Sequence, residues 1–185
     1  MDNVTDVSQV HSSERPSSVD SGLRIRLLDP KTMPGDEMAA LWKKVENQDY
    51  AFDDNTRGNP QAFVLNLVAP ASHHFLVADS AYVTVRNVFE DSDCSIHFVL
   101  WDRSFPFRNI IEAGRQILEW LYKERSVHRV SGFIPKFNTL ALRFATTMGF
   151  KYEGTMRKSL KWKGEFHDVD VYGLLAKEFD RRWQQ

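Results

Sequence analysis

The chain has 185 residues, 42% of them hydrophobic, and this length and composition favour a single domain with a continuous core. Its 24 basic and 25 acidic residues give a formal net charge of -1, which argues against extended nucleic-acid binding. The single cysteine, Cys94, excludes an intramolecular disulfide, and no apolar run approaches the roughly 20 residues that cross a bilayer. Because the start of the chain lacks the apolar core of a secretory signal, we expect a soluble, cytoplasmic protein without a membrane partner.

Residues 1–22 differ in composition from the rest of the chain. Six serines and four acidic residues stand there among almost no large apolar side chains. Such a segment cannot repay the entropy of ordering by burial, so we expect a flexible arm ahead of a domain over residues 23–185. An arm of this kind is also a candidate docking element for a protein partner.

The first half of the domain is expected to hold a strand, two helices and a three-stranded meander. Apolar residues alternate at 23–27 as in a strand and recur at helical spacing at 38–45. The pair Asn59-Pro60 is typical of a helix start, and Pro70 of a helix end. Strands separated by turn-like segments follow at residues 75–78, 82–89 and 95–101.

The second half predicts alternating helices and strands. Residues 109–123 place apolar side chains on one helical face, and a strand at 129–134 follows, which implies a parallel crossover. Asn138 is a suitable cap for the next helix, and Gly149 is suitable for its left-handed end. The closing strands are expected at residues 150–152 and 169–175.

A basic cluster surrounds Trp162, and its cations are Arg157, Lys158, Lys161 and Lys163. Cations beside an aromatic ring are also found where proteins bind bases and phosphates. The simpler interpretation is a hairpin whose lysines face outward while Leu160 and Trp162 face inward. Asp168 would then pair with Lys161 or Lys163, although it is also placed to orient an amine.

The stretch from residue 138 to 175 carries a series of positions that we compared with known families: Asn138, Ala141, Gly149, Phe150, Glu153, Gly154, Gly164 and Asp168. This series resembles the final third of the Gcn5-related N-acetyltransferase (GNAT) superfamily, nearest its ribosomal-protein-alanine acetyltransferase-like branch. The resemblance covers roughly residues 23–180. It implies an α/β (α+β) GNAT-like fold of order β-α-α-β-β-β-α-β-α-β-β, with a mixed, twisted sheet and a cofactor cleft where the fourth and fifth strands splay.

The resemblance also implies that acetyl-coenzyme A is the cofactor, with its pyrophosphate at the start of the helix after the fourth strand. Anchored on Glu112-Ala113, the family signature falls on Arg103, Pro106 and Arg108, so a proline and an arginine replace its two glycines. Loss of one backbone donor to a charged ligand costs about 1.5–3 kcal/mol. Arg103 or Arg108 can compensate, because a guanidinium binds phosphate bidentately. The alternative is a rigid loop whose arginines are solvated.

The remaining site residues follow the same resemblance. Asn138 is expected to contact the cofactor as well as to cap its helix, and the backbone of Val99 and Trp101 is expected to supply cofactor and oxyanion contacts. Phe144 stands where many members have a tyrosine that protonates the leaving thiolate. Strand alternation and an ordinary pKa near neutrality make His97 the catalytic candidate, as a general base; the alternative is a hydrogen-bonded sheet histidine.

Two functions remain open. The first is an acetyl-CoA-dependent N-acetyltransferase acting on an unidentified amine. The second is a non-catalytic, acetyltransferase-like structural or assembly protein, such as a phage virion component, that docks through the N-terminal arm. The sequence has no zinc-ligand spacing, Walker loop or Gly-x-Ser-x-Gly elbow, so we expect no metal and no hydrolase chemistry.

Overall fold

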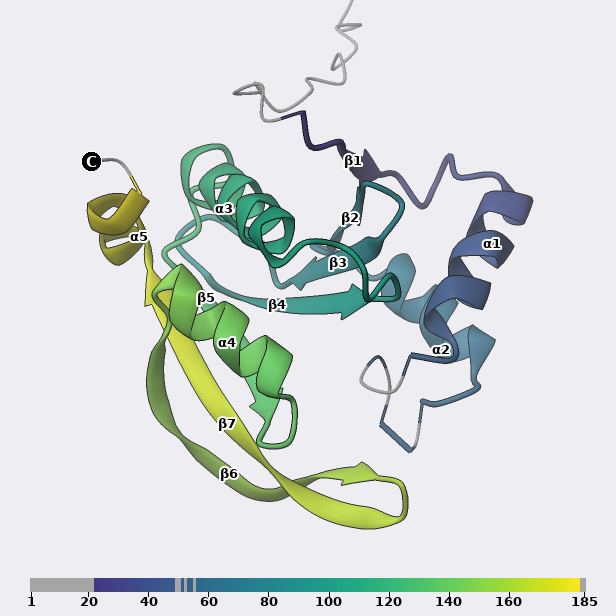
Figure 1. The fold of residues 1–185 in the computed structure, drawn as a ribbon. Coiled ribbons are helices and arrows are strands. Elements are labelled where there is room, and N and C mark those ends of the chain that lie inside the picture. Colours follow the sequence, from purple (N-terminus) through teal and green to yellow (C-terminus); the bar gives the residue numbers. More distant parts are fainter. Residues whose placement is uncertain (1–21, 49–50, 52, 55, 184–185) are drawn as a thin grey trace, which may run out of the picture.

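The computed structural model describes residues 22–48, 51, 53–54 and 56–183. The predicted arm therefore lies outside the described residues except for Gly22. The described chain forms one seven-stranded mixed sheet with helices on both faces (Figure 1). None of its helices has the length and apolar character needed to span a membrane.

The elements follow the predicted order with one helix added at the end. Those of the first half are β1 (Ile25–Leu28), α1 (Gly35–Val45), α2 (Pro60–Leu67), β2 (His73–Val77), β3 (Ala81–Arg86) and β4 (Asp93–Leu100). Those of the second half are α3 (Phe107–Lys123), β5 (Arg129–Pro135), α4 (Thr139–Met148), β6 (Lys151–Trp162), β7 (Glu165–Leu175) and α5 (Ala176–Trp183). The sequence analysis missed α5 and made β6 too short.

The strand order across the sheet is β1-β2-β3-β4-β5-β7-β6. The first four strands form the predicted antiparallel meander, and α3 connects β4 to β5 as a parallel crossover. β4 and β5 pair over only three residue pairs, from Asp93↔Arg129 to Ser95↔Ser131. Beyond these pairs the two strands part, so the predicted splay is confirmed.

Two apolar layers cover the sheet because successive strand residues face opposite sides. Val83 and Val85 face the larger layer, to which α3, α4 and α5 contribute. Tyr82 and Val99 face the smaller layer, to which α1 and α2 contribute. Helices α4 and α2 therefore lie on opposite faces of the sheet.

The helix start at the end of β5 is well defined. The Asn138 side-chain oxygen accepts a hydrogen bond from the Ala141 amide at 3.1 Å, so the predicted cap is confirmed. Gly149 ends the helix with a φ of 98°, which is in the left-handed region that glycine tolerates best. These two residues fix the ends of α4 beside the β4–β5 gap.

The β6–β7 hairpin is long and curves under α4 toward the loop that joins α1 to α2 (Figure 1). Its two-residue turn has positive φ at Lys163 (51°) and Gly164 (82°), as a type I′ turn requires. The Asp54 carboxylate accepts both amide hydrogens of this turn, at 2.8 Å each. The α1–α2 loop is thus tied to the tip of the hairpin.

An irregular segment in β6 corrects one expectation. Lys158 has a φ of 52°, and the register of β6 against β7 shifts between Met156 and Leu160. The Asp168 carboxylate accepts the Lys158 amide at 3.0 Å and pairs with Lys136 at 3.6 Å. The predicted pairing of Asp168 with Lys161 or Lys163 was wrong, because the carboxylate stabilises this bulge instead.

Candidate active site

A cavity of about 620 Å³ lies at the β4–β5 gap, and residues of both α4 and α2 line it. Its walls come from the gap between β4 and β5, the start of α4, the middle of β3, helix α2 and the β6–β7 hairpin. Phe63, Phe137 and Trp162 make much of its wall aromatic, and Trp162 stacks on Phe137 with ring centroids 4.5 Å apart. The predicted inward orientation of Trp162 is therefore confirmed.

Backbone amides of β4 face the gap, but they are not those of Val99 and Trp101, which were expected. The Trp101 amide donates to the Ser80 carbonyl at 3.2 Å. Because hydrogen-bonded pairs alternate along the regular β3–β4 ladder, the Val99 amide is also directed toward β3. The structure therefore corrects the expectation for Val99 and Trp101: the amides of Phe98 and Leu100 are the ones directed toward β5, past the end of its pairing with β4.

His97 lies on the cavity wall, opposite Thr84 in the β3–β4 register. Its side chain faces the same side of the sheet as Val99, which is the α1–α2 side. It is an exposed residue, so solvent can reach it. This position permits proton exchange between His97 and a ligand in the cavity.

A buried polar group lies behind this wall and was not recognised in the sequence. His74 is only 1% exposed, and its Nδ1 lies 2.6 Å from the Tyr82 hydroxyl and 3.1 Å from the Thr84 hydroxyl. Burial lowers the pKa of His74 to about 4 and raises the pKa of Tyr82. Tyr82 and Thr84 line the cavity, so a neutral histidine supports two groups of its wall.

The α4 side of the cavity is apolar apart from Asn138. Phe144 packs on Phe98 with ring centroids 5.7 Å apart, and both rings line the cavity. Gly114 of α3 allows this packing, since a Cβ at that position would lie 2.6 Å from the Phe144 ring. Phe144 has no proton to donate, as the sequence indicated.

The start of α3 lies outside the lining of this cavity. Pro106 is the helix N-cap and lacks an amide hydrogen, whereas the Asn109 and Ile110 amides bond to its carbonyl. Phe107 and Arg108 thus contribute the amides that the helix itself leaves without a partner. The Arg143 guanidinium lies 4.0 Å from the centre of the Phe107 ring, so α4 brings a further cation to this end of α3.

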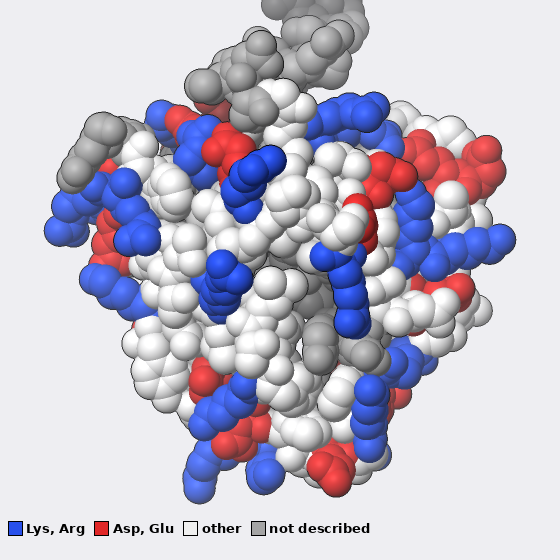
Figure 2. Space-filling model, viewed as in Figure 1, with Lys and Arg blue, Asp and Glu red and all other residues white. Residues whose placement is uncertain are grey.

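The loop before α3 has its own carboxylate. Asp102 accepts the Ser104 amide at 2.9 Å and the Ser80 hydroxyl at 3.2 Å, and the Ser104 hydrogen bonds lower its pKa. On the face shown in Figure 2, Lys and Arg side chains stand apart and alternate with Asp and Glu. This face therefore carries no field of one sign.

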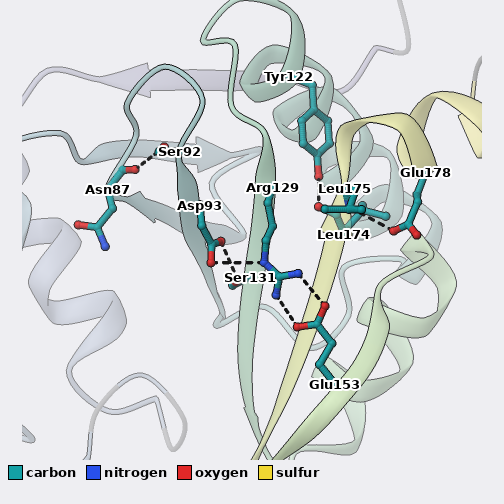
Figure 3. A network of polar contacts seen from close by, with 10 residues as sticks. All are labelled: Asn87, Ser92, Asp93, Tyr122, Arg129, Ser131, Glu153, Leu174, Leu175 and Glu178. Atoms are coloured by element: carbon teal, nitrogen blue, oxygen red, sulfur yellow. Dashed lines mark hydrogen bonds and ion pairs between the residues drawn. The ribbon is translucent and has the colours of Figure 1, made fainter.

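A polar network stabilises the end where β4 and β5 still pair (Figure 3). The Arg129 guanidinium bonds Asp93 at 3.3 Å and binds the Glu153 carboxylate with two nitrogens, one at 2.6 Å. The Ser131 hydroxyl donates to Asp93 at 2.7 Å. The two carboxylates raise the pKa of Arg129, and the guanidinium lowers the pKa of Glu153. Three strands are thereby joined at the closed end of the gap.

The structure brings together His97, Val99 and Asn138 on one cavity. Arg103 and Arg108 do not line it, and neither does Trp101, whose indole nitrogen donates to the Asp79 carbonyl at 2.8 Å. The register of β2 against β3 puts His74, Tyr82 and Thr84 on one face, and alternation within each strand does not give this register.

The fold is that of the Gcn5-related N-acetyltransferases. A mutant of the spermidine N-acetyltransferase SpeG from Vibrio cholerae superposes with a TM-score of 0.69 at 14% identity, covering 88% of this chain and 99% of that one. A GNAT-family acetyltransferase from Bacillus anthracis gives a TM-score of 0.64 at 20% identity, covering 84% and 96%. At these identities the likeness concerns the fold alone.

Sequence comparison gives a shorter match. No family model matches the chain. A curated relative, the SPbeta prophage-derived uncharacterized N-acetyltransferase YokL of Bacillus subtilis (strain 168), is 28% identical over 64 residues. The match covers 35% of this chain and 36% of that protein, so it spans about a third of the relative's length.

Proposed function

We propose that this chain is an acetyl-CoA-dependent N-acetyltransferase that acts on an amine. The observation that carries the proposal is the single cavity that joins the β4–β5 gap to His97 and the hairpin. Strand amides at the gap and a titratable side chain on the same cavity are what acyl transfer to an amine requires. The nearer resemblance to the ribosomal-protein-alanine branch stays a prediction.

Several groups of the chain fit an extended, phosphate-bearing thioester. The amides of Phe98 and Leu100 face the gap, and the Asn138 side-chain nitrogen has no protein partner within the described residues. The amides of Phe107 and Arg108, with the guanidinium of Arg103, Arg108 or Arg143, provide donors for phosphate at the start of α3. Bound there, acetyl-CoA would supply the activated acetyl group.

The chain's own groups account for the proton movements. With acetyl-CoA bound, the acceptor nitrogen would form its bond to the acetyl carbon as the carbon–sulfur bond breaks, and His97 would accept the proton that the nitrogen loses, directly or through water. Phe144 cannot donate, so the departing sulfur takes its proton from solvent. The Phe98 and Leu100 amides would stabilise the negative charge on the acetyl oxygen.

Calorimetric titration with acetyl-CoA tests the proposal, using Asn138→Ser as the key variant. Serine retains a capping oxygen for α4 but removes the side-chain amide donor. We expect micromolar binding that weakens about 10-fold in Asn138→Ser, with the free energy of unfolding nearly unchanged. Asn59→Ser is the matched control, because Asn59 caps α2 in the same way and should leave the affinity unaltered.

The absence of binding at millimolar acetyl-CoA would contradict the proposal. That result would favour the non-catalytic, assembly-protein interpretation, in which the fold serves for its surfaces.

If acetyl-CoA binds, His97→Gln separates binding from chemistry. Loss of a general base typically lowers turnover by about 10²–10⁴-fold, and we expect this range with the acetyl-CoA affinity retained. The control His128→Gln replaces an exposed histidine outside the cavity and should leave turnover unaltered. Full turnover by His97→Gln would remove this residue from the mechanism.

A further inference from the structure

Among the described residues that line the cavity, one is a lysine or arginine, and it is Arg86. It ends β3 on the face that carries Tyr82 and Thr84, and the register of β3 against β4 puts it opposite Ser95. His97 is the next residue of β4 on that face, about 7 Å farther along the strand. An arginine side chain is long enough to reach a ligand that lies against His97.

The guanidinium of Arg86 has no ion-pair or hydrogen-bond partner within the part of the chain that the structure describes. Asp93, on the same face of the sheet, accepts hydrogen bonds from Arg129 and Ser131 instead (Figure 3). Asp53, a carboxylate on the cavity lining, accepts the Thr56 amide at 2.9 Å and the Thr56 hydroxyl at 2.8 Å.

The charge of Arg86 acts on the cavity wall. Its positive field contributes to the lowered pKa of His74 and opposes the rise in the pKa of Tyr82. A cation that lines a cavity and lacks a carboxylate partner is complementary to an anionic ligand group. The same cation repels a ligand that is positive throughout.

We propose that Arg86 binds a carboxylate or phosphate of the acceptor, so that the substrate class is an amine that also carries an anionic group. This inference rests on the proposed function, since it names the acceptor of the same site. An acceptor of this class differs from spermidine, which is a polycation and is the substrate named for the structural neighbour SpeG.

Equilibrium binding of matched amines to the full chain tests this inference without requiring turnover. The pairs are lysine against cadaverine and phosphoethanolamine against ethanolamine, with spermidine as the polycation, each titrated at low salt with and without coenzyme A. We expect at least one anionic member to bind about 10-fold more tightly than its partner. Arg86→Gln should abolish this preference, and Arg86→Lys should retain part of it.

Arg24→Gln is the matched control, because Arg24 is exposed, precedes β1 and does not line the cavity. It should keep the preference of the unsubstituted protein. The inference is overturned if spermidine, or both cadaverine and ethanolamine, bind as tightly as the anionic amines, if no amine binds, or if Arg86→Gln keeps the preference. A failure of the acetyl-CoA titration with the preference intact would overturn the proposed function, and with it the role of the bound amine as acceptor, but not the binding of an anionic group by Arg86.

Discussion

His74 lies behind the cavity wall, where burial holds its imidazole neutral. Its pKa in the folded chain is about 4, against 6.5 when unperturbed. Between these two values the unfolded chain binds a proton that the folded chain does not. Acid therefore favours unfolding through this residue, and the effect is absent above the unperturbed pKa.

We expect the free energy of unfolding to fall by about 3 kcal/mol through His74 as the pH drops from 6.5 to 4. Urea titrations across this range on the unsubstituted protein and on His74→Gln measure the difference. The variant should lose most of the acid dependence, and the remainder belongs to other groups such as His73, whose pKa burial also lowers. An equally steep acid dependence in both proteins, or its loss in the exposed-site control His128→Gln, would contradict this assignment.

Single residues also show what sequence reasoning could and could not reach. Asn138 and Gly149 were predictable because helix caps depend on local chemistry. The His74 group was not, since its partners lie 8 and 10 residues away and only strand pairing brings them together. The backbone groups of Val99 and Trp101 were misassigned because the resemblance does not give the strand register that sets the direction of each amide.

At the scale of elements, the β6–β7 hairpin differs most from the structure that the sequence predicted. β6 is mostly exposed, so its residues lack the apolar alternation that marks a half-buried strand. α5 was missed because Phe179 is its one buried residue, with its ring centroid 5.3 Å from that of Tyr122, and five of its eight residues are charged. Both elements depend on neighbours that are distant in sequence.

The tie between Asp54 and the hairpin turn is testable by hydrogen exchange. Asp54→Ala removes the acceptor of the Lys163 and Gly164 amides, and we expect these two amides to exchange about 10-fold faster. Asp29→Ala is the control, because Asp29 also accepts a backbone amide, that of Lys31, at a different site. Unchanged exchange at the turn would mean that the tie does not persist in solution.

The same tie should depend on pH in a defined direction. The hydrogen bond from the Gly164 amide is the largest cause of the lowered pKa of Asp54. The carboxylate therefore stays ionised well below neutrality, and the tie weakens only when strong acid protonates it.

For the whole molecule, hydrophobic periodicity predicted most of the order of the elements, and the resemblance carried by the series from Asn138 to Asp168 implied the GNAT-like fold and the β4–β5 splay. The cavity's charge was not predictable. Arg86 is an ordinary strand-end arginine in the sequence, and its lack of a partner depends on where Asp93 and Asp53 are directed in space. The fold places these groups together, and only their geometry defines which ligand they suit.

The short pairing of β4 with β5 has a mechanical consequence. A sheet whose neighbouring strands pair along their whole length resists bending as a plate does, whereas three residue pairs and the Arg129 contacts form a hinge. We expect the β1–β4 block and the β5–β7 block to move against each other more readily along this short pairing than the strands within either block. A ligand that bridges the gap would then reduce this motion.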